Sequence, residues 1–256
     1  MSDNIFWMVS DNFGDALNPY LYEKITGRAS VNVEANSTDP HLMMIGSILN
    51  HANKNAIVWG CGLARLSDPV DPACDIRSVR GPISRQIAID RGAKCPDVYG
   101  DPALLLPRFY PGTSTNENML GVIPHVVDYA ACRDSFSRYD GVKIIDLTQP
   151  IETVLDELLT CANVISSSLH GLIVADAYGI PSYWVEFSQN VLGDYTKFFD
   201  YFESVGIKKY HPVRLNSLEH FDFRLFEPVD MKVDLDLLLN AFPSEYVNNF
   251  VNRSDG

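Results

Sequence analysis

The segment SSSLHG gathers several chemically useful side chains at one junction of the sequence. It joins an apolar, strand-like run to a helical pattern that ends at Gly179. The hydroxyls of Ser166, Ser167 and Ser168 and the imidazole of His170 therefore occupy the start of a helix, where backbone N–H groups lack intrahelical partners. Such a helix start can bind an anion, and His170 can exchange a proton with the bound group. The structural alternative is a serine N-cap followed by a hydrogen-bonded core histidine.

A second candidate anion site lies where another apolar run ends at Arg80. Gly81 and Pro82 follow, and proline is favoured at the first position of a helix, here one that closes at Gly92. A guanidinium beside free backbone N–H groups suits a carboxylate or a phosphate. The structural alternative is a salt bridge, because the chain carries an excess of acidic residues.

The loop after the first apolar run contains Asn12, Gly14 and Asp15. With Asn18 as N-cap and a proline directly after it, the sequence predicts a helix that ends at Gly27 and leaves the preceding residues in the loop. Gly14 permits a tight backbone, and polar side chains here would project from the carboxyl end of a strand, where open α/β sheets bind ligands. The structural alternative is that Asp15 only caps a turn.

The segment VYGDPALLLP repeats the same arrangement. Asp101 precedes a proline that can take the first position of a helix. We favour a capping role for Asp101 and keep it among the candidate substrate-binding residues.

The elements that position these residues alternate along the chain. Short apolar runs are separated by amphipathic segments, which is typical of parallel strands covered by helices on both faces. The predicted strands are 5–10, 42–49, 56–62, 75–80, 119–125, 142–147, 163–168 and 181–187. The predicted helices are 18–27, 81–92, 151–162, 169–179, 194–206 and 233–242. This pattern predicts an α/β protein.

The most linker-like stretch lies near residues 112–117, where small and polar residues gather before a fresh strand. We place a domain boundary there and predict two Rossmann-like domains, residues 1–114 and 115–256. Two such domains would face each other across a cleft lined by strand-to-helix loops.

The composition argues against several functional classes. The formal net charge is −13 with only 20 Lys and Arg in 256 residues, which argues against nucleic acid as a partner. No apolar run approaches the ~20 residues that span a bilayer, and the N-terminus lacks signal-peptide features, so we expect a cytoplasmic protein. The five cysteines form no C-x-x-C pair and are expected to be reduced and buried. The six histidines show no metal-binding spacing, and we predict no metal site.

Five ordered motifs carry a family resemblance: DNFGDALNPYLYEKITGR, VRGPISRQ, VYGDPALLLP, GVIPHVVDY and SSSLHGLIVADAYGIP. In order and spacing the chain resembles the polysaccharide pyruvyl transferase family. The resemblance implies two Rossmann-like domains in an arrangement like that of GT-B glycosyltransferases. It also implies transfer of a pyruvyl group from phosphoenolpyruvate onto two hydroxyls of a surface-glycan sugar as a ketal, with release of phosphate. Phosphoenolpyruvate is then a co-substrate, and no cofactor is expected.

The resemblance also implies an acceptor and a place of action. The acceptor would be a saccharide or a lipid-linked oligosaccharide, and a lipid-linked acceptor would bring the protein into peripheral contact with the inner membrane. The chemistry requires proton transfer to the donor's methylene carbon and attack by sugar hydroxyls, and none of these steps demands a metal.

The resemblance implies roles for individual residues. The phosphoenolpyruvate-binding arginine falls on Arg80, the loop acid on Asp15 and the L-H-G histidine on His170, and we assign His170 and Asp15 as catalytic. The candidate substrate-binding residues are Arg80, Ser166, Ser167, Ser168, Asn12, Gly14, Arg85, His125, Asp101 and Lys197.

One position departs from the family pattern. Many members have an arginine before Leu-His-Gly, whereas this chain has Ser168, so one donor-binding cation is missing. Lys197, Arg65, Arg85 or a hydroxyl and helix-dipole site can replace it. The sequence also permits two other functions. One is a nucleotide-sugar glycosyltransferase of GT-B shape, and the other is a catalytically silent glycan-binding protein, for which Ser168 is the main support.

Overall fold

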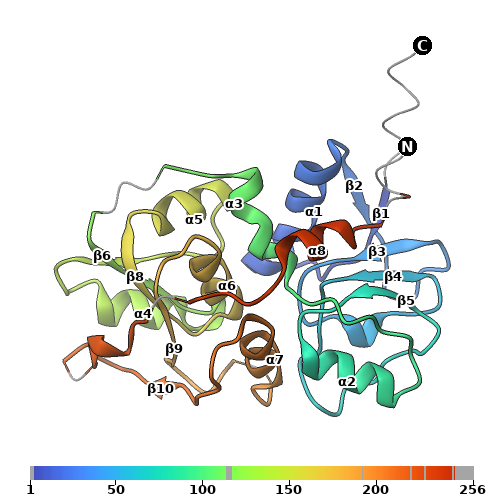
Figure 1. The fold of residues 1–256 in the computed structure, drawn as a ribbon. Coiled ribbons are helices and arrows are strands. Elements are labelled where there is room, and N and C mark those ends of the chain that lie inside the picture. The colour runs from blue at the N-terminus through green and yellow to red at the C-terminus, as the bar shows by residue number, and fades with distance from the viewer. Residues whose placement is uncertain are drawn as a thin grey trace.

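Two lobes make up the described part of the chain, each built around a parallel sheet of five strands (Figure 1). The computed structural model describes residues 3–113, 117–191, 193–219, 221–227, 229–243 and 245. The predicted α/β class is confirmed, and the two parallel sheets agree with two Rossmann-like halves. The predicted boundary between residues 114 and 115 lies outside the described residues.

The first lobe has the strand order β2-β1-β3-β4-β5. Its elements in chain order are β1 (Asp3–Ile5), α1 (Phe13–Thr26), β2 (Ser30–Asn32), β3 (His41–Met43), a 3-10 turn (Leu49–His51), β4 (Ala56–Trp59), β5 (Asp75–Ser78) and α2 (Pro82–Asp90). The inner strand β3 is buried along its whole length, as the apolar run in this part of the sequence predicted.

The second lobe has the strand order β10-β9-β8-β6-β7. Its elements are β6 (Met119–Ile123), a 3-10 turn (Val126–Asp128), α4 (Tyr129–Phe136), β7 (Val142–Ile144), α5 (Ile151–Leu158), β8 (Cys161–Ser166), α6 (Leu169–Ala177), β9 (Ser182–Glu186), α7 (Thr196–Val205), β10 (Val213–Arg214) and a second 3-10 turn (Phe223–Leu225). The helix α6 is buried almost throughout, which explains why its sequence is apolar on nearly every side.

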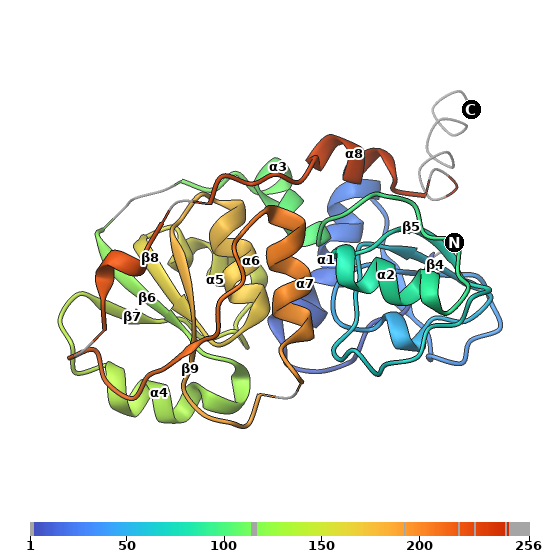
Figure 2. The ribbon, with the colours of Figure 1, turned by 60° about the horizontal axis from the view of Figure 1, so that its bottom comes forward.

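Two segments cross between the lobes. A 3-10 turn (Pro102–Leu105) and α3 (Leu106–Phe109) lead out of the first lobe, and α8 (Leu235–Asn240) returns to it from the second (Figures 1 and 2). The indole N–H of Trp59 donates to the carbonyl of Leu238 at 2.8 Å, and Phe242 packs edge-on against the same indole. A single apolar core therefore continues from one lobe into the other.

The predicted start of the first helix is wrong. The helix α1 begins at Phe13, and its N-cap is Asn12, whose side-chain oxygen accepts a hydrogen bond from the N–H of Gly14 at 3.2 Å. The residues before Asn18, for which the sequence predicts a loop, thus form the first turn of the helix. This places Asp15 where a negative charge is stabilised by the helix dipole.

Asn18 is fully buried inside α1 and has a different structural role. Its amide donates to the carbonyls of Asp15 at 3.2 Å and Ile45 at 3.1 Å, and its oxygen accepts from the N–H of Ile45 at 2.9 Å. Pro19 has no N–H to offer to the Asp15 carbonyl, which lies four residues before it. The Asn18 side chain satisfies that carbonyl and ties α1 to the loop after β3.

Several smaller features bear on the sequence predictions. The helix ends at Gly27, Gly92 and Gly179 are confirmed, each with the glycine at positive φ, and Pro82 begins α2 as predicted. The five cysteines are unpaired and buried, as expected. The helix α4 and the edge strands β2 and β10 were not predicted, and the predicted strand 42–49 contributes only its first residues to β3.

Candidate active site

The starts of α1 and α6 meet between the lobes. We call the region around residues 12–15 and 166–170 the seam. A Cβ atom on Gly14 would lie 2.0 Å from Nδ1 of His170, which no real contact permits. The imidazole of α6 therefore rests directly against the backbone of α1. Only glycine at position 14 allows this approach, so the two candidate loops that the sequence placed 156 positions apart share one site.

His170 also faces a carboxylate from the first lobe. Its Nε2 lies 3.5 Å from Oδ2 of Asp101, and these two buried atoms have no hydrogen-bond partner among the residues that the structure describes. The other oxygen of Asp101 accepts from the N–H of Ala103 at 3.0 Å. The predicted capping role of Asp101 is thus confirmed, and its second oxygen is directed at the imidazole. A carboxylate beside a histidine orients the ring and stabilises the imidazolium that forms during proton transfer.

Asp15 lies near this pair in the first turn of α1. The hydroxyl of Ser10 donates to its carboxylate, and His170 is close enough to act on its charge. Burial raises the pKa of Asp15, while the Ser10 hydrogen bond and His170 partly oppose the increase. A carboxyl with a raised pKa is suited to accept and return a proton.

The three serines before α6 have different surroundings. The hydroxyl of Ser166 donates to the carbonyls of Ile123 and Ser168 and is fully buried, so it holds the strand-to-helix turn together. The hydroxyl of Ser167 accepts from the N–H of His125 at 2.9 Å and donates to Asp128 at 3.3 Å. Ser168 is the N-cap of α6, but its hydroxyl makes no capping hydrogen bond.

His125 follows β6 and caps the 3-10 turn after it. Its Nδ1 accepts from the N–H of Val127 at 3.4 Å. Burial lowers the pKa of His125, and Lys197 and His170 lower it further, while Asp128 opposes them. His125 is therefore a neutral imidazole at pH 7, placed among the charges of the seam.

Lys197, in the first turn of α7, shares a narrow pocket with Ser167, Glu186 and Tyr195. Its ammonium stands over the ring of Phe198, with Nζ 5.4 Å from the ring centroid. Across the described ranges, it has no carboxylate within ion-pair distance and no hydrogen bond. Burial lowers the pKa of Lys197 to about 8, and the positive charges of Arg80 and Arg65 add to the effect.

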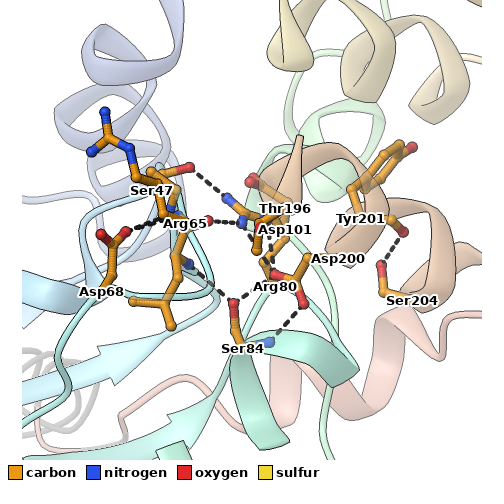
Figure 3. A network of polar contacts seen from close by, with 12 residues as sticks. Ser47, Arg65, Asp68, Arg80, Ser84, Asp101, Thr196, Asp200, Tyr201 and Ser204 are labelled. Atoms are coloured by element: carbon orange, nitrogen blue, oxygen red, sulfur yellow. Dashed lines mark hydrogen bonds and ion pairs between the residues drawn. The ribbon is translucent and has the colours of Figure 1, made fainter. Parts of the chain in front are cut away.

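Arg80 is completely buried and paired with a carboxylate from the other lobe (Figure 3). Its Nε donates to Asp200 at 3.1 Å, Nη1 donates to the hydroxyl of Ser47 at 2.9 Å, and Nη2 donates to the carbonyl of Leu63 at 2.6 Å. Arg80 therefore forms a salt bridge, which was the structural alternative for this residue. The expectation that this guanidinium faces an open ligand site is therefore corrected.

Asp200 also occupies the N-terminus of α2. Asp200 accepts from the N–H of Ser84 at 2.9 Å and from its hydroxyl at 2.6 Å. The anion site read from the order Arg80, Gly81, Pro82 thus exists, and the anion is a side chain of α7. A Cβ on Gly81 would lie 2.0 Å from the carbonyl oxygen of Asp200, so the glycine is required for this contact.

The other predicted residues, Arg85 and Asn12, make structural contacts. Arg85 donates from Nε to the carbonyl of Pro96 at 3.1 Å and is directed at that loop. Asn12 serves as the cap of α1. Asp200 and Asp128 were not predicted. Asp128 is an acidic residue within the motif GVIPHVVDY, so the sequence contained a signal for it, whereas no local pattern marks Asp200 on its helix.

Comparison with known proteins identifies the family. A family model described as polysaccharide pyruvyl transferase matches residues 34–189, more than half of the chain. The chain belongs to the polysaccharide pyruvyl transferase family. The resemblance inferred from the five motifs is confirmed. The match to the family model includes Arg80, Asp101 and the segment from Ser166 to His170, while Asp15 and Lys197 lie outside it.

Two curated proteins are similar to this chain. An uncharacterised protein of Acanthamoeba polyphaga mimivirus is 34% identical over 254 residues, which cover 92% of this chain and 87% of that protein. The succinoglycan biosynthesis protein ExoV of Rhizobium meliloti is 27% identical over 223 residues, which cover 80% of this chain and 64% of ExoV. The match to the family model supports a pyruvyl transferase role for this chain. Among the residues that the structure describes, no helix has the length and apolar character needed to cross a membrane.

Proposed function

We propose that this pyruvyl transferase takes its pyruvyl group from phosphoenolpyruvate and places it on two hydroxyls of a saccharide as a ketal. The family membership and the relationship to a succinoglycan biosynthesis protein support a pyruvyl transferase with a saccharide acceptor. The donor, the ketal linkage, a lipid-linked form of the acceptor and action in the cytoplasm at the inner membrane are parts of the proposal.

The observation that carries the proposal is the pair of His170 and Asp101. The imidazole rests against the backbone at Gly14 on one side and faces a buried carboxylate at 3.5 Å on the other. A histidine positioned in this way can act as general acid and general base in turn. Asp15, with its raised pKa, supplies a second group for proton transfer at the same place.

The proposed reaction balances without an external proton source. A proton is added to the methylene carbon of phosphoenolpyruvate, which becomes a methyl group and leaves an oxocarbenium-like centre at the adjacent carbon. One sugar hydroxyl adds to that carbon and gives up its proton. The C–O bond to phosphate then breaks, and the second hydroxyl closes the ketal and gives up its own proton. Of the two hydroxyl protons, one replaces the proton used on the methylene carbon and the other leaves on the phosphate.

Binding of the donor would use the polar groups that the seam leaves available. Ser168 and the first N–H groups of α6 offer hydrogen-bond donors to an anion. His125 and Ser167 lie beside them, and Asn12 and Gly14 border the acceptor side of His170 in this proposal. The two-lobed, GT-B-like arrangement with an acceptor cleft belongs to the same proposal.

The experiment that tests the proposal combines phosphate release with mass spectrometry of a saccharide library. Phosphate should be released from phosphoenolpyruvate only when a suitable acceptor is present, and that acceptor should gain one ketal-linked pyruvyl group. His170→Asn should lower turnover by roughly 10²–10⁴-fold with little change in donor affinity. A destabilised but fully active His170→Asn protein would show that His170 is only a core residue.

Two alternatives have separate outcomes in the same experiments. A nucleotide-sugar glycosyltransferase would be stabilised in a thermal-shift assay by a nucleotide sugar and not by phosphoenolpyruvate. A catalytically silent glycan-binding protein is favoured by Ser168 and by the occupied guanidinium of Arg80. Such a protein would bind saccharides and release no phosphate with any acceptor.

A further inference from the structure

The positive side chains around the seam are not equally available to a ligand. Arg80 is enclosed by Asp200, Ser47 and the Leu63 carbonyl, and it has no exposed surface. A Cβ on Gly62 would already lie 2.7 Å from its Cζ, so there is no space for a substrate carboxylate beside it. A ligand could reach this guanidinium only by displacing Asp200.

Arg85 and Arg65 are also poor candidates for a central role. Arg85 is held by the Pro96 carbonyl. Arg65 is exposed, and its backbone N–H donates to Asp68 at 2.8 Å, which fixes its loop but not its guanidinium. An exposed arginine is screened by solvent and contributes less to binding than a charge in a dry pocket.

Lys197 has the opposite surroundings. It lies three residues before Asp200 on α7, a spacing at which lysine and aspartate commonly pair on a helix. Here Asp200 is turned toward the first lobe, where Ser84 and Arg80 use both of its oxygens. The side chain of Lys197 therefore lines a narrow pocket of about 10 Å³ and has no carboxylate at ion-pair distance among the residues that the structure describes. This is room for about one water molecule, so an anionic group enters only if the lining side chains shift.

The charged and titratable groups near Lys197 come from the ends of four strands. Arg80 follows β5 and Arg65 follows β4, and both repel its ammonium. His125, after β6, is neutral. Glu186, at the end of β9, lines the same pocket, but its carboxylate accepts a hydrogen bond from the hydroxyl of Tyr195 at 2.6 Å. Lys197 and Glu186 thus place one charge of each sign in the pocket lining, but the Glu186 carboxylate already accepts a hydrogen bond from Tyr195, which leaves the Lys197 ammonium as the group that favours an anionic ligand.

We propose that Lys197, and not Arg80, is the cation that binds the anionic group of the donor, and that Asp200 is the positioning residue that brings this about. Asp200 neutralises Arg80, fastens α7 to the first lobe and leaves the Lys197 ammonium free for a ligand. Lys197 thereby supplies the positive charge that Ser168 does not. The identity of the donor as phosphoenolpyruvate rests on the proposed function, whereas the anion site itself does not.

Calorimetric titration with phosphoenolpyruvate, and separately with inorganic phosphate, tests the role of Lys197. Lys197→Met should weaken binding of both by roughly 10- to 100-fold, because a charge-assisted contact is lost. Lys197→Arg should recover part of the affinity. Lys209→Met is the matched control, because Lys209 follows α7 and pairs with Glu203 on the exposed side of that helix. The Lys209→Met protein should bind both anions as the unaltered protein does.

The role of Asp200 is tested by the pH dependence of phosphate binding. The affinity should fall as Lys197 loses its proton near pH 8. Asp200→Asn leaves the charge of Arg80 uncompensated, so the midpoint of this fall should move to lower pH. Ser84→Ala keeps both charges but weakens the hold on Asp200, which the Ser84 N–H and Arg80 still contact, so the midpoint should move slightly to higher pH. A role of Asp200 in stability alone would change the melting temperature and leave both midpoints in place.

The outcomes separate this inference from the proposed function. If Lys197→Met abolishes phosphate binding in a protein that shows no turnover with any acceptor, the anion site stands and the proposed reaction fails. If Lys197→Met binds both anions normally, the inference is overturned whatever the activity. Unchanged pH midpoints in both Asp200→Asn and Ser84→Ala would overturn the positioning role of Asp200.

Discussion

Nε2 of His170 lies 3.5 Å from Oδ2 of Asp101, and the two residues belong to different lobes. The imidazole stands on the helix that follows β8, and the carboxylate stands on the 3-10 turn that leads out of the first lobe. Both atoms are buried, and neither has a hydrogen-bond partner in the described part of the chain. A small approach of the two groups completes the hydrogen bond, so the geometry of the pair depends on how closely the lobes pack.

Asp101→Asn should separate catalysis from capping. Asparagine caps a helix about as well as aspartate, so the melting temperature should change little. The neutral amide does not stabilise an imidazolium, so turnover should fall by roughly 10²–10⁴-fold. Thermal unfolding and phosphate release measured on one preparation check this. Asp101→Ala is the companion variant and should lose about 1 kcal/mol of stability in addition. Normal turnover in Asp101→Asn would limit Asp101 to its capping role.

Gly14→Ala tests the contact between α1 and His170. Alanine is intrinsically better than glycine in a helix by about 1 kcal/mol, but its Cβ would overlap the imidazole, with 2.0 Å to Nδ1. The ring or the helix start must move, and we expect a loss of turnover larger than any loss of stability. Ala16→Ser, at an exposed position of the same helix, is the control and should keep full turnover. An active and more stable Gly14→Ala protein would contradict the contact.

Asp15→Asn should change the pH dependence of both activity and stability. Burial raises the pKa of Asp15, so the folded protein holds this proton more tightly than the unfolded chain does. The contribution of Asp15 to stability therefore declines as pH rises through its raised pKa. At pH 7 the Asn variant should be as stable as the unaltered protein or more so, and the difference should vanish in acid.

The same variant tests the catalytic assignment of Asp15. Turnover should fall because a proton acceptor is lost, and the acid limb of the pH–rate profile should lose the step that belongs to Asp15. Unfolding measured at several pH values, together with that profile, decides both points. Unchanged turnover would leave Asp15 with a role at the helix start only.

Arg80→Ala should act mainly on stability. Removing one partner of a buried ion pair leaves the Asp200 carboxylate uncompensated, which destabilises proteins by about 3–5 kcal/mol. Urea unfolding measures this effect. Arg108→Ala breaks an exposed pair with Asp236 and should change the free energy of unfolding by less than about 1 kcal/mol. A stable Arg80→Ala protein with strongly reduced phosphoenolpyruvate affinity would instead restore the donor-binding role.

The sequence predicted local features better than contacts between lobes. The alternation of apolar runs and helical patterns predicted both parallel sheets, and the order Arg80, Gly81, Pro82 predicted an anion at a helix start. The anion is Asp200, which lies 120 positions further along the chain, and no local rule reveals such a partner. The N-cap of α1 was misplaced because Asn12 and Asn18 fit capping rules equally well. Asn18 instead satisfies the Asp15 carbonyl and binds Ile45, and the second of these contacts exists only in the folded chain.

The return of α8 to the first lobe limits how the two lobes can move. The chain passes from the first lobe to the second near α3 and comes back at α8, where the Trp59 indole is bonded to the Leu238 carbonyl. A body attached to another at one point can swivel in any direction, whereas attachment at two points leaves a single axis. The two crossings therefore favour rocking of one lobe against the other about the line that joins them, and the shared core and the Arg80–Asp200 pair oppose that motion. The loops farthest from that line must travel the greatest distance.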